Sequence, residues 1–184
     1  MAQTGWRAAA VMLALFFVSG CGSPERDKFF RQVAEGDEFT VRSELKRNPD
    51  WLNTRNEDGR TPLCLAAYRG QEKMVELLVN AGAEVDARDA LGRTPLYWSA
   101  AERKQGSVGL LLARGADVKA RDRWGKTPLL VAAANGDKGT AELLLARGAD
   151  LDARDNDGRT PLYWALMNGH KEMADTLLAR GAKK

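Results

Sequence analysis

Few side chains in this sequence have the chemistry and spacing of catalytic or metal-binding groups. The chain has one histidine, His170, so no second imidazole can share a metal or a nucleophilic triad with it. Asp89, Asp122 and Asp155 could form carboxylate pairs, but they recur every 33 residues as part of a turn. Hydrogen bonding within that turn is the better interpretation. No glycine-rich stretch fits a phosphate-binding loop. We therefore expect no catalytic residues, no metal and no cofactor.

The two cysteines lie in very different surroundings. Cys21 follows Val18-Ser19-Gly20, directly after an apolar run over residues 8–18 that Arg7 precedes. This run is shorter than the ~20 residues that span a bilayer, and it is typical of the central part of a secretory signal. Cys64 lies in an apolar segment, where a small buried residue is a better interpretation than a reactive thiol.

Small residues before a cysteine at this place resemble the bacterial lipobox. The resemblance implies a lipoprotein signal peptide over residues 1–20 and lipidation of Cys21. Gly22 stands where an aspartate often signals inner-membrane retention, so we expect an outer-membrane lipoprotein facing the periplasm, in preference to the inner membrane. The alternatives are an uncleaved anchor, or an ordinary secretory signal with an incidental cysteine. Residues 21–26 would form a tether, whose last five residues reach at most about 18 Å when extended.

A 33-residue repeat predicts the elements that position the remaining side chains. The pentapeptide Gly-Arg/Lys-Thr-Pro-Leu occurs four times, beginning at Gly59, Gly92, Gly125 and Gly158. In each copy the glycine allows a tight turn, the threonine caps a helix, and the proline occupies its first position. A second helix with paired aliphatic residues follows and ends at a glycine. Self-similarity at this period predicts a stacked array of helical units.

The pattern D-x-x-G-x-T-P-L, continued by the second helix and G-A-D-V, resembles the ankyrin repeat. The resemblance is strong over residues 56–182 and weak over residues 24–55. It implies an all-α ankyrin-repeat solenoid of helix-turn-helix units joined by β-hairpin loops, with about five repeats. The units are a degenerate N-terminal cap at 27–55, repeats at 56–88, 89–121 and 122–154, and a C-terminal repeat at 155–184.

Three departures from the family pattern lead to expectations. Arg103 takes the place of the glycine between the two helices, which predicts strain or an altered loop. Trp98 and Trp164 occupy a position that is usually a core leucine, so we expect both in the core. The histidine that usually follows Thr-Pro-Leu, and bonds back to the threonine, is replaced by Cys64, Tyr97, Leu130 and Tyr163. That polar link is therefore lost or replaced by packing.

The resemblance implies a partner-binding concave face, lined by the hairpin tips and the first helix of each repeat. Carried onto this sequence, the candidate residues are Leu91, Trp124, Arg93, Lys126, Tyr97, Tyr68, Arg60, Arg159 and Tyr163. Arginine, tyrosine and tryptophan are enriched in binding hot spots, so these residues predict a partner protein with an acidic patch. The alternative for the basic positions is ordinary repeat composition, paired locally with turn aspartates, because exposed ion pairs contribute little energy. That alternative is weaker for Trp124, which has no repeat-packing role at a hairpin tip.

These observations predict a non-enzymatic protein–protein interaction module, held in the bacterial envelope by its N-terminal lipid and acting as a monomer. The net charge of +3 is too small to indicate a nucleic-acid partner. By resemblance, two roles are open: an immunity protein against a toxin, or support of a periplasmic enzyme such as a catalase in stress defence. The alternative is a structural envelope lipoprotein, a spacer without one specific high-affinity partner. Export and the lack of catalytic groups disfavour a hydrolase or a nucleic-acid binder.

Overall fold

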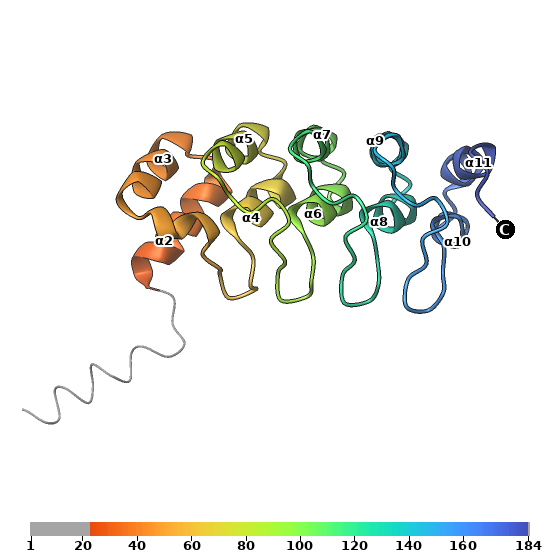
Figure 1. Ribbon diagram of the computed structural model, residues 1–184, viewed down its shortest axis with the longest axis horizontal. Helices are drawn as coiled ribbons and strands as arrows, with labels where there is room; N and C mark the ends of the chain where they lie inside the picture. Colours follow the sequence, from red (N-terminus) through yellow and green to blue (C-terminus); the bar gives the residue numbers. More distant parts are fainter. Residues whose placement is uncertain (1–22, 184) are drawn as a thin grey trace, which may run out of the picture.

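The computed structural model describes residues 23–183 as a single row of helix pairs (Figure 1). The signal sequence and Cys21 lie outside the described residues. The five pairs are α2 (Pro24–Glu35) with α3 (Glu38–Arg47), α4 (Pro62–Arg69) with α5 (Glu72–Asn80), α6 (Pro95–Ala101) with α7 (Gln105–Ala113), α8 (Pro128–Ala134) with α9 (Lys138–Ala146), and α10 (Pro161–Met167) with α11 (Lys171–Ala179). A short 3-10 helix, η1 (Pro49–Asn53), follows the first pair.

The helices form two layers, as the predicted all-α solenoid requires. The even-numbered helices pack side by side in one layer and the odd-numbered helices in the other (Figure 1). Hairpin-shaped loops join successive pairs and project beyond the even-numbered layer. We call the surface formed by these loops and the even-numbered helices the hairpin face.

Backbone hydrogen bonds define the loops, although no residue within 23–183 forms a regular strand. Each loop is closed at its tip: in the second repeat the Asp89 N–H donates to the Arg93 carbonyl at 2.9 Å. Adjacent loops are also joined, since the Arg123 N–H donates to the Leu91 carbonyl at 3.0 Å and the Asn156 N–H to the Trp124 carbonyl at 2.9 Å. The loops therefore form a continuous ribbon that holds their tips in register.

Local sequence explains where the helices begin and turn. In α6 the Thr94 Oγ1 accepts the Tyr97 N–H at 3.2 Å, and Pro95 takes the first helical position. The other three repeats turn from first to second helix through a left-handed glycine, as at Gly136, where φ is 65°. Arg103 takes the same conformation with φ of 58°. The predicted strain is thus confirmed, and the loop keeps its length, because Lys104 N–H still donates to the Ser99 carbonyl at 2.8 Å.

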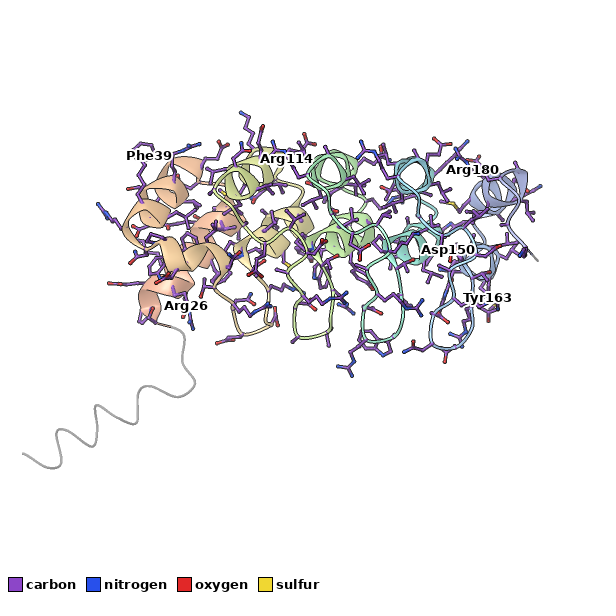
Figure 2. All side chains as sticks on the ribbon, in the orientation of Figure 1. Arg26, Phe39, Arg114, Asp150, Tyr163 and Arg180 are labelled. Atoms are coloured by element: carbon purple, nitrogen blue, oxygen red, sulfur yellow. The ribbon has the colours of Figure 1, made fainter. Side chains whose placement is uncertain are left out.

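The N-terminal unit differs in part from the expectation. Ser23 caps α2, with its Oγ accepting the Arg26 N–H at 3.2 Å, and the helix begins at Pro24. Residues 24–26, which were expected to be tether, are therefore helical. The second helix of this unit is α3, and its Phe39 is 84% exposed at the outer end of the array (Figure 2).

The two tryptophans in the first helices differ in burial, so the expected core position is confirmed for Trp98 and wrong for Trp164. The main core lies between the layers and is built from residues such as Phe29, Leu96 and Leu129. Trp98 is buried outside it, in a small separate cluster with Cys64 and Tyr97. Trp164 is only half-buried. An indole has an N–H that needs an acceptor, and both rings find one on the hairpin side instead of between the layers.

Candidate functional site

Basic and aromatic side chains form an alternating row along the hairpin face. The Trp98 ring centroid lies 4.1 Å from the Arg60 guanidinium carbon and 4.8 Å from that of Arg93. Two repeats further on, the Trp164 centroid lies 4.3 Å from Lys126 Nζ and 5.2 Å from the Arg159 guanidinium carbon. Each ring thus contacts the basic residue of its own repeat and that of the preceding repeat. All these distances are within the range of cation–π attraction.

Turn aspartates orient the two indoles. Asp89 Oδ1 accepts the backbone N–H groups of Leu91 and Arg93, which leaves Oδ2 to accept the Trp98 indole N–H at 2.9 Å. Asp155 makes the same three contacts, with its Oδ2 accepting the Trp164 indole N–H at 2.9 Å. Both carboxylates are buried. The turn aspartates therefore have a structural role, as the sequence suggested, and they also fix the rings of the row.

The repeat at 122–154 lacks this pair, because Val131 stands nine residues after Asp122, where the other two repeats have tryptophan. Asp122 Oδ1 still accepts the backbone N–H groups of Trp124 and Lys126. Its Oδ2 is buried without a hydrogen-bond partner. The Nε of Arg93 lies 4.0 Å from it and is also buried without a partner. One buried carboxylate oxygen and one buried guanidinium nitrogen thus face each other as an ion pair, close to the Tyr97 hydroxyl.

Tyr97 and Cys64 lie behind the row, and burial keeps the phenol and the thiol in their neutral forms. Burial, followed by the negative charge of Asp122, raises the pKa of Tyr97 to about 12, although Arg93 opposes the shift. Burial likewise raises the pKa of the Cys64 thiol, whose Sγ donates to the Ala87 carbonyl at 3.6 Å. A buried thiol with a raised pKa is a poor nucleophile. This agrees with its interpretation as a small packing residue.

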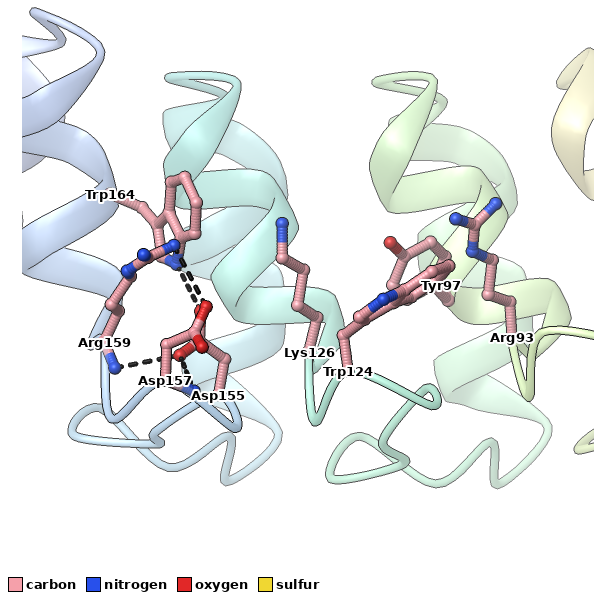
Figure 3. Close-up of a pocket in the computed structure, with 8 residues that line it drawn as sticks. All are labelled: Arg93, Tyr97, Trp124, Lys126, Asp155, Asp157, Arg159 and Trp164. Carbon is pink, nitrogen blue, oxygen red and sulfur yellow. Dashed lines mark hydrogen bonds and ion pairs between the residues drawn. The ribbon is translucent and has the colours of Figure 1, made fainter.

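A cavity of about 310 Å³ opens in the row beside the repeat at 122–154 (Figure 3). One side is formed by Arg93, Tyr97 and Trp124, the other by Asp155, Asp157, Arg159 and Trp164, and Lys126 lies between them. Trp124 is 41% exposed and stacks against Arg93 at 5.3 Å. Arg159 pairs with Asp157 at 3.2 Å. Among the described residues, no carboxylate lies within 4.0 Å of Lys126 Nζ, so its charge is available to a ligand.

The structure groups most of the predicted binding residues around this row, and Leu91 lies apart from it. The cavity brings together Arg93, Tyr97, Trp124, Lys126 and Arg159. Arg60 and Tyr68 lie at the other side of Trp98, with a Tyr68–Trp98 centroid distance of 5.4 Å. Leu91 is half-buried in its hairpin. Tyr163 is 40% exposed at the C-terminal end (Figure 2), where its ring centroid lies 5.9 Å from that of Trp164 and 5.7 Å from the Arg159 guanidinium carbon.

Sequence reasoning missed three cavity residues: Asp155, Asp157 and Trp164. Trp164 was assigned to the core by its place in the repeat, and Asp155 was treated only as a turn residue. The signal that could have found them is the constant interval of nine residues from Asp89 to Trp98 and from Asp155 to Trp164. This interval predicts that Asp89 and Asp155 each bond a tryptophan, and that Asp122, with Val131 at the same interval, does not.

Two other kinds of site are absent among the described residues. Within 23–183, no three histidine, cysteine, aspartate or glutamate side chains lie together as metal ligands. No helix in the same range has the length and hydropathy needed to cross a membrane. The hairpin face with its basic and aromatic row is therefore the candidate site.

Comparison with known proteins agrees with the architecture. The family model for ankyrin repeats, in three copies, matches residues 30–122 and 100–184. Ankyrin repeat and SAM domain-containing protein 6 of Rattus norvegicus is 35% identical over 66 residues, which are 36% of this chain and 8% of that protein. The Mus musculus protein of the same name has the same identity and coverage. The matched region is thus 8% of the length of these curated relatives.

Proposed function

Because the chain belongs to the ankyrin repeat family, whose arrays are protein–protein interaction modules, we propose that it binds a partner protein through its hairpin face. The contact surface is the basic–aromatic row, which comprises Arg60, Trp98, Arg93, Trp124, Lys126, Trp164 and Arg159. The observation that supports this most strongly is the exposed indole of Trp124 at a hairpin tip, between two basic side chains. Such a ring is a typical hot-spot anchor.

The charges of the row favour an acidic partner surface. Arg60 and Arg159 are paired with exposed aspartates of their own hairpins, at 3.9 and 3.2 Å. Pairs of this kind contribute little energy in water, so an incoming carboxylate can replace them at small cost. Lys126 has no such partner among the described residues. The row therefore presents positive charge beside aromatic surface, which complements an acidic patch and speeds encounter with it.

The test is a pull-down from native membranes, with bound proteins identified by mass spectrometry. We expect Trp124→Ala combined with Leu91→Ala to lose one partner selectively. The matched control is Leu143→Ala, which removes a side chain of similar exposure, 38%, from α9 in the opposite layer. It should retain the partner. If the double variant keeps every co-purifying protein, the array is better described as an envelope spacer without a specific partner.

We also infer that the array works at the periplasmic side of the outer membrane, held by lipid on Cys21. The support is the sequence of residues 1–22 alone: a basic residue, an apolar run, and small residues before a cysteine. Several acyl chains hold a protein firmly, at ~0.8 kcal/mol per buried methylene. Cys21→Ser should release the protein into the soluble fraction or leave an unprocessed precursor. Processed variant protein that stays on the membrane would contradict the anchor.

The biological role divides into two testable cases, immunity against a toxin and support of a periplasmic enzyme. A toxin gene or a catalase gene beside the gene for this chain would favour one or the other. In both cases we propose that the array acts as a monomer with a single partner. Light scattering of the purified protein, alone and with that partner, measures both masses.

A further inference from the structure

The basic–aromatic row is complete at two places and open at a third. Trp98 occupies the space between Arg60 and Arg93, and Trp164 the space between Lys126 and Arg159. Between Arg93 and Lys126 the corresponding residue is Val131, which has no ring to offer either cation.

Trp124 fills only part of this space. Its ring reaches over from the hairpin tip to contact Arg93 at 5.3 Å and Arg123 at 4.6 Å. No contact of this kind joins it to Lys126 among the described residues. What remains between Trp124 and Trp164 is the cavity of about 310 Å³. At ~30 Å³ per water this holds roughly ten waters, which is enough for one aromatic side chain but too little for a helix or strand.

The charged side chains around the cavity determine which groups of a partner can bind beside an aromatic ring. Lys126 Nζ contacts the Trp164 ring and forms no ion pair within 4.0 Å among residues 23–183, although Asp155 and Asp157 line the same cavity. Arg93 Nε is buried without a hydrogen bond, 4.0 Å from Asp122 Oδ2. Arg159 adds a third positive charge at the far side, shared with Asp157. The lining thus has three cationic side chains against two carboxylates, Asp155 and Asp157. A carboxylate placed beside Lys126 would gain a charge-assisted hydrogen bond.

We propose that this cavity receives an aromatic side chain of the partner that is flanked by carboxylate residues. The ring packs between Trp124 and Trp164, over the Lys126 side chain, and an adjacent carboxylate pairs with Lys126 Nζ. This completes the row with a ring supplied by the partner. The inference rests on the proposed function, since it names the feature of the partner that the hairpin face selects.

The test uses short peptides and the full chain carrying Cys21→Ser. Three five-residue peptides are compared: phenylalanine at the centre of aspartate and glutamate residues, alanine in the same acidic surroundings, and phenylalanine among lysines. Phenylalanine does not obscure the protein's own indoles, so tryptophan fluorescence and the indole N–H resonances report occupancy. We expect the acidic phenylalanine peptide to bind about tenfold more tightly than the acidic alanine peptide, and the basic peptide not to bind.

Variants of one lysine test the charge. Lys126→Met should weaken the acidic phenylalanine peptide about tenfold, and Lys126→Arg should restore most of its affinity. Lys138→Met is the matched control, because Lys138 lies in α9 of the opposite layer and pairs along its own helix with Glu142 at 3.9 Å. It should bind like the parent chain. Unchanged melting temperatures show that the variants are folded.

Three results would overturn the inference: equal affinity for the phenylalanine and alanine peptides, equal affinity of the Lys126→Met variant and the parent chain, or no binding of either acidic peptide. None of them decides the proposed function. That proposal fails only if the Trp124 and Leu91 double variant keeps its partner in the pull-down. If the double variant loses its partner in the pull-down but Lys126→Met leaves peptide affinity unchanged, the hairpin face remains the binding surface and this cavity is excluded as the aromatic site.

Discussion

Replacing Asp89 and Asp122 by asparagine, one at a time, should have very different effects. In both hairpins Oδ1 accepts two backbone N–H groups, and an asparagine oxygen can do the same. The first full repeat shows this, because Asn56 Oδ1 accepts the N–H groups of Asp58 and Arg60 at 3.1 and 2.9 Å. The difference between the two sites therefore comes from Oδ2 alone.

At Asp89 the new amide would point an N–H group at the indole N–H of Trp98, where a charged acceptor lies now at 2.9 Å. A hydrogen bond to a charged group contributes about 1.5–3 kcal/mol, so Asp89→Asn should cost about 2 kcal/mol. At Asp122 the replaced oxygen has no hydrogen bond to lose. The lost attraction to Arg93 is small, because the two atoms are 4.0 Å apart and the Arg93 side chain, 20% exposed, keeps its cation–π contacts with Trp98 and Trp124. The fully buried Asp122 carboxylate also no longer has to be desolvated. Asp122→Asn should therefore change stability by less than about 0.5 kcal/mol.

Thermal unfolding followed by circular dichroism measures both effects. At about 2–4 °C per kcal/mol for a chain of this size, Asp89→Asn should lower the melting temperature by about 4–8 °C and Asp122→Asn by about 2 °C or less. A double variant, Asp89→Asn with Trp98→Leu, recreates the natural pairing of Asn56 with Leu65 and should cost less than the two single changes added together. Equal losses for the two asparagine variants, or strict additivity in the double variant, would refute the reasoning.

Three further predictions concern other parts of the array, each measured by unfolding. Arg103→Gly should stabilise the fold by about 0.5–1 kcal/mol, because relief of left-handed strain exceeds the added freedom of the unfolded chain. Gly169→Ala should destabilise it through the same strain, since φ is 74° and no atom lies within 4 Å of the new Cβ. Changes of the same sign in the two variants would contradict this explanation. The pKa of Tyr97 is raised to about 12 from about 10, so its neutral phenol supports the fold up to about pH 10, and this support is lost between about pH 10 and 12. Tyr97→Phe should flatten that alkaline loss, and absorbance should show one tyrosine titrating late. Phe39→Ser, at a residue 84% exposed, should change stability by less than about 0.5 kcal/mol, whereas Phe29→Ala, at a fully buried one, should cost about 3–5 kcal/mol.

The fold was predictable because its rules act over short stretches of sequence. A threonine cap followed by proline begins each first helix, and the left-handed residue before the second helix was recognisable even as Arg103, where no glycine marks it. The start of α2 could also have been predicted, since Ser23 before Pro24 is a typical cap and first position. The tether interpretation rests on their place before the first apolar residues, Phe29 and Phe30, although the local signal favours a helix.

The site was harder to predict because it depends on contacts between repeats. A tryptophan at a position usually filled by leucine suggests the core, and only the demand of the indole N–H for an acceptor contradicts this. Asp89 meets that demand from the preceding hairpin, at a distance set by how the loop folds back on α6. The exposure of side chains at equivalent positions could not be predicted either. Tyr97 is 8% exposed and Tyr163 is 40% exposed, although both follow Thr-Pro-Leu.

The same contacts explain why the open place in the row falls at Val131. The first helices alternate between a large pair and a small pair after Thr-Pro-Leu, so Tyr97 and Trp98 lie between Cys64 with Leu65 on one side and Leu130 with Val131 on the other. Val131 packs directly against the cluster that contains Tyr97. Close packing against that cluster limits the size of the side chain at 131. Valine has no indole for Asp122 Oδ2 and no ring for Lys126, and the row is open beside the cavity that we assign to the partner.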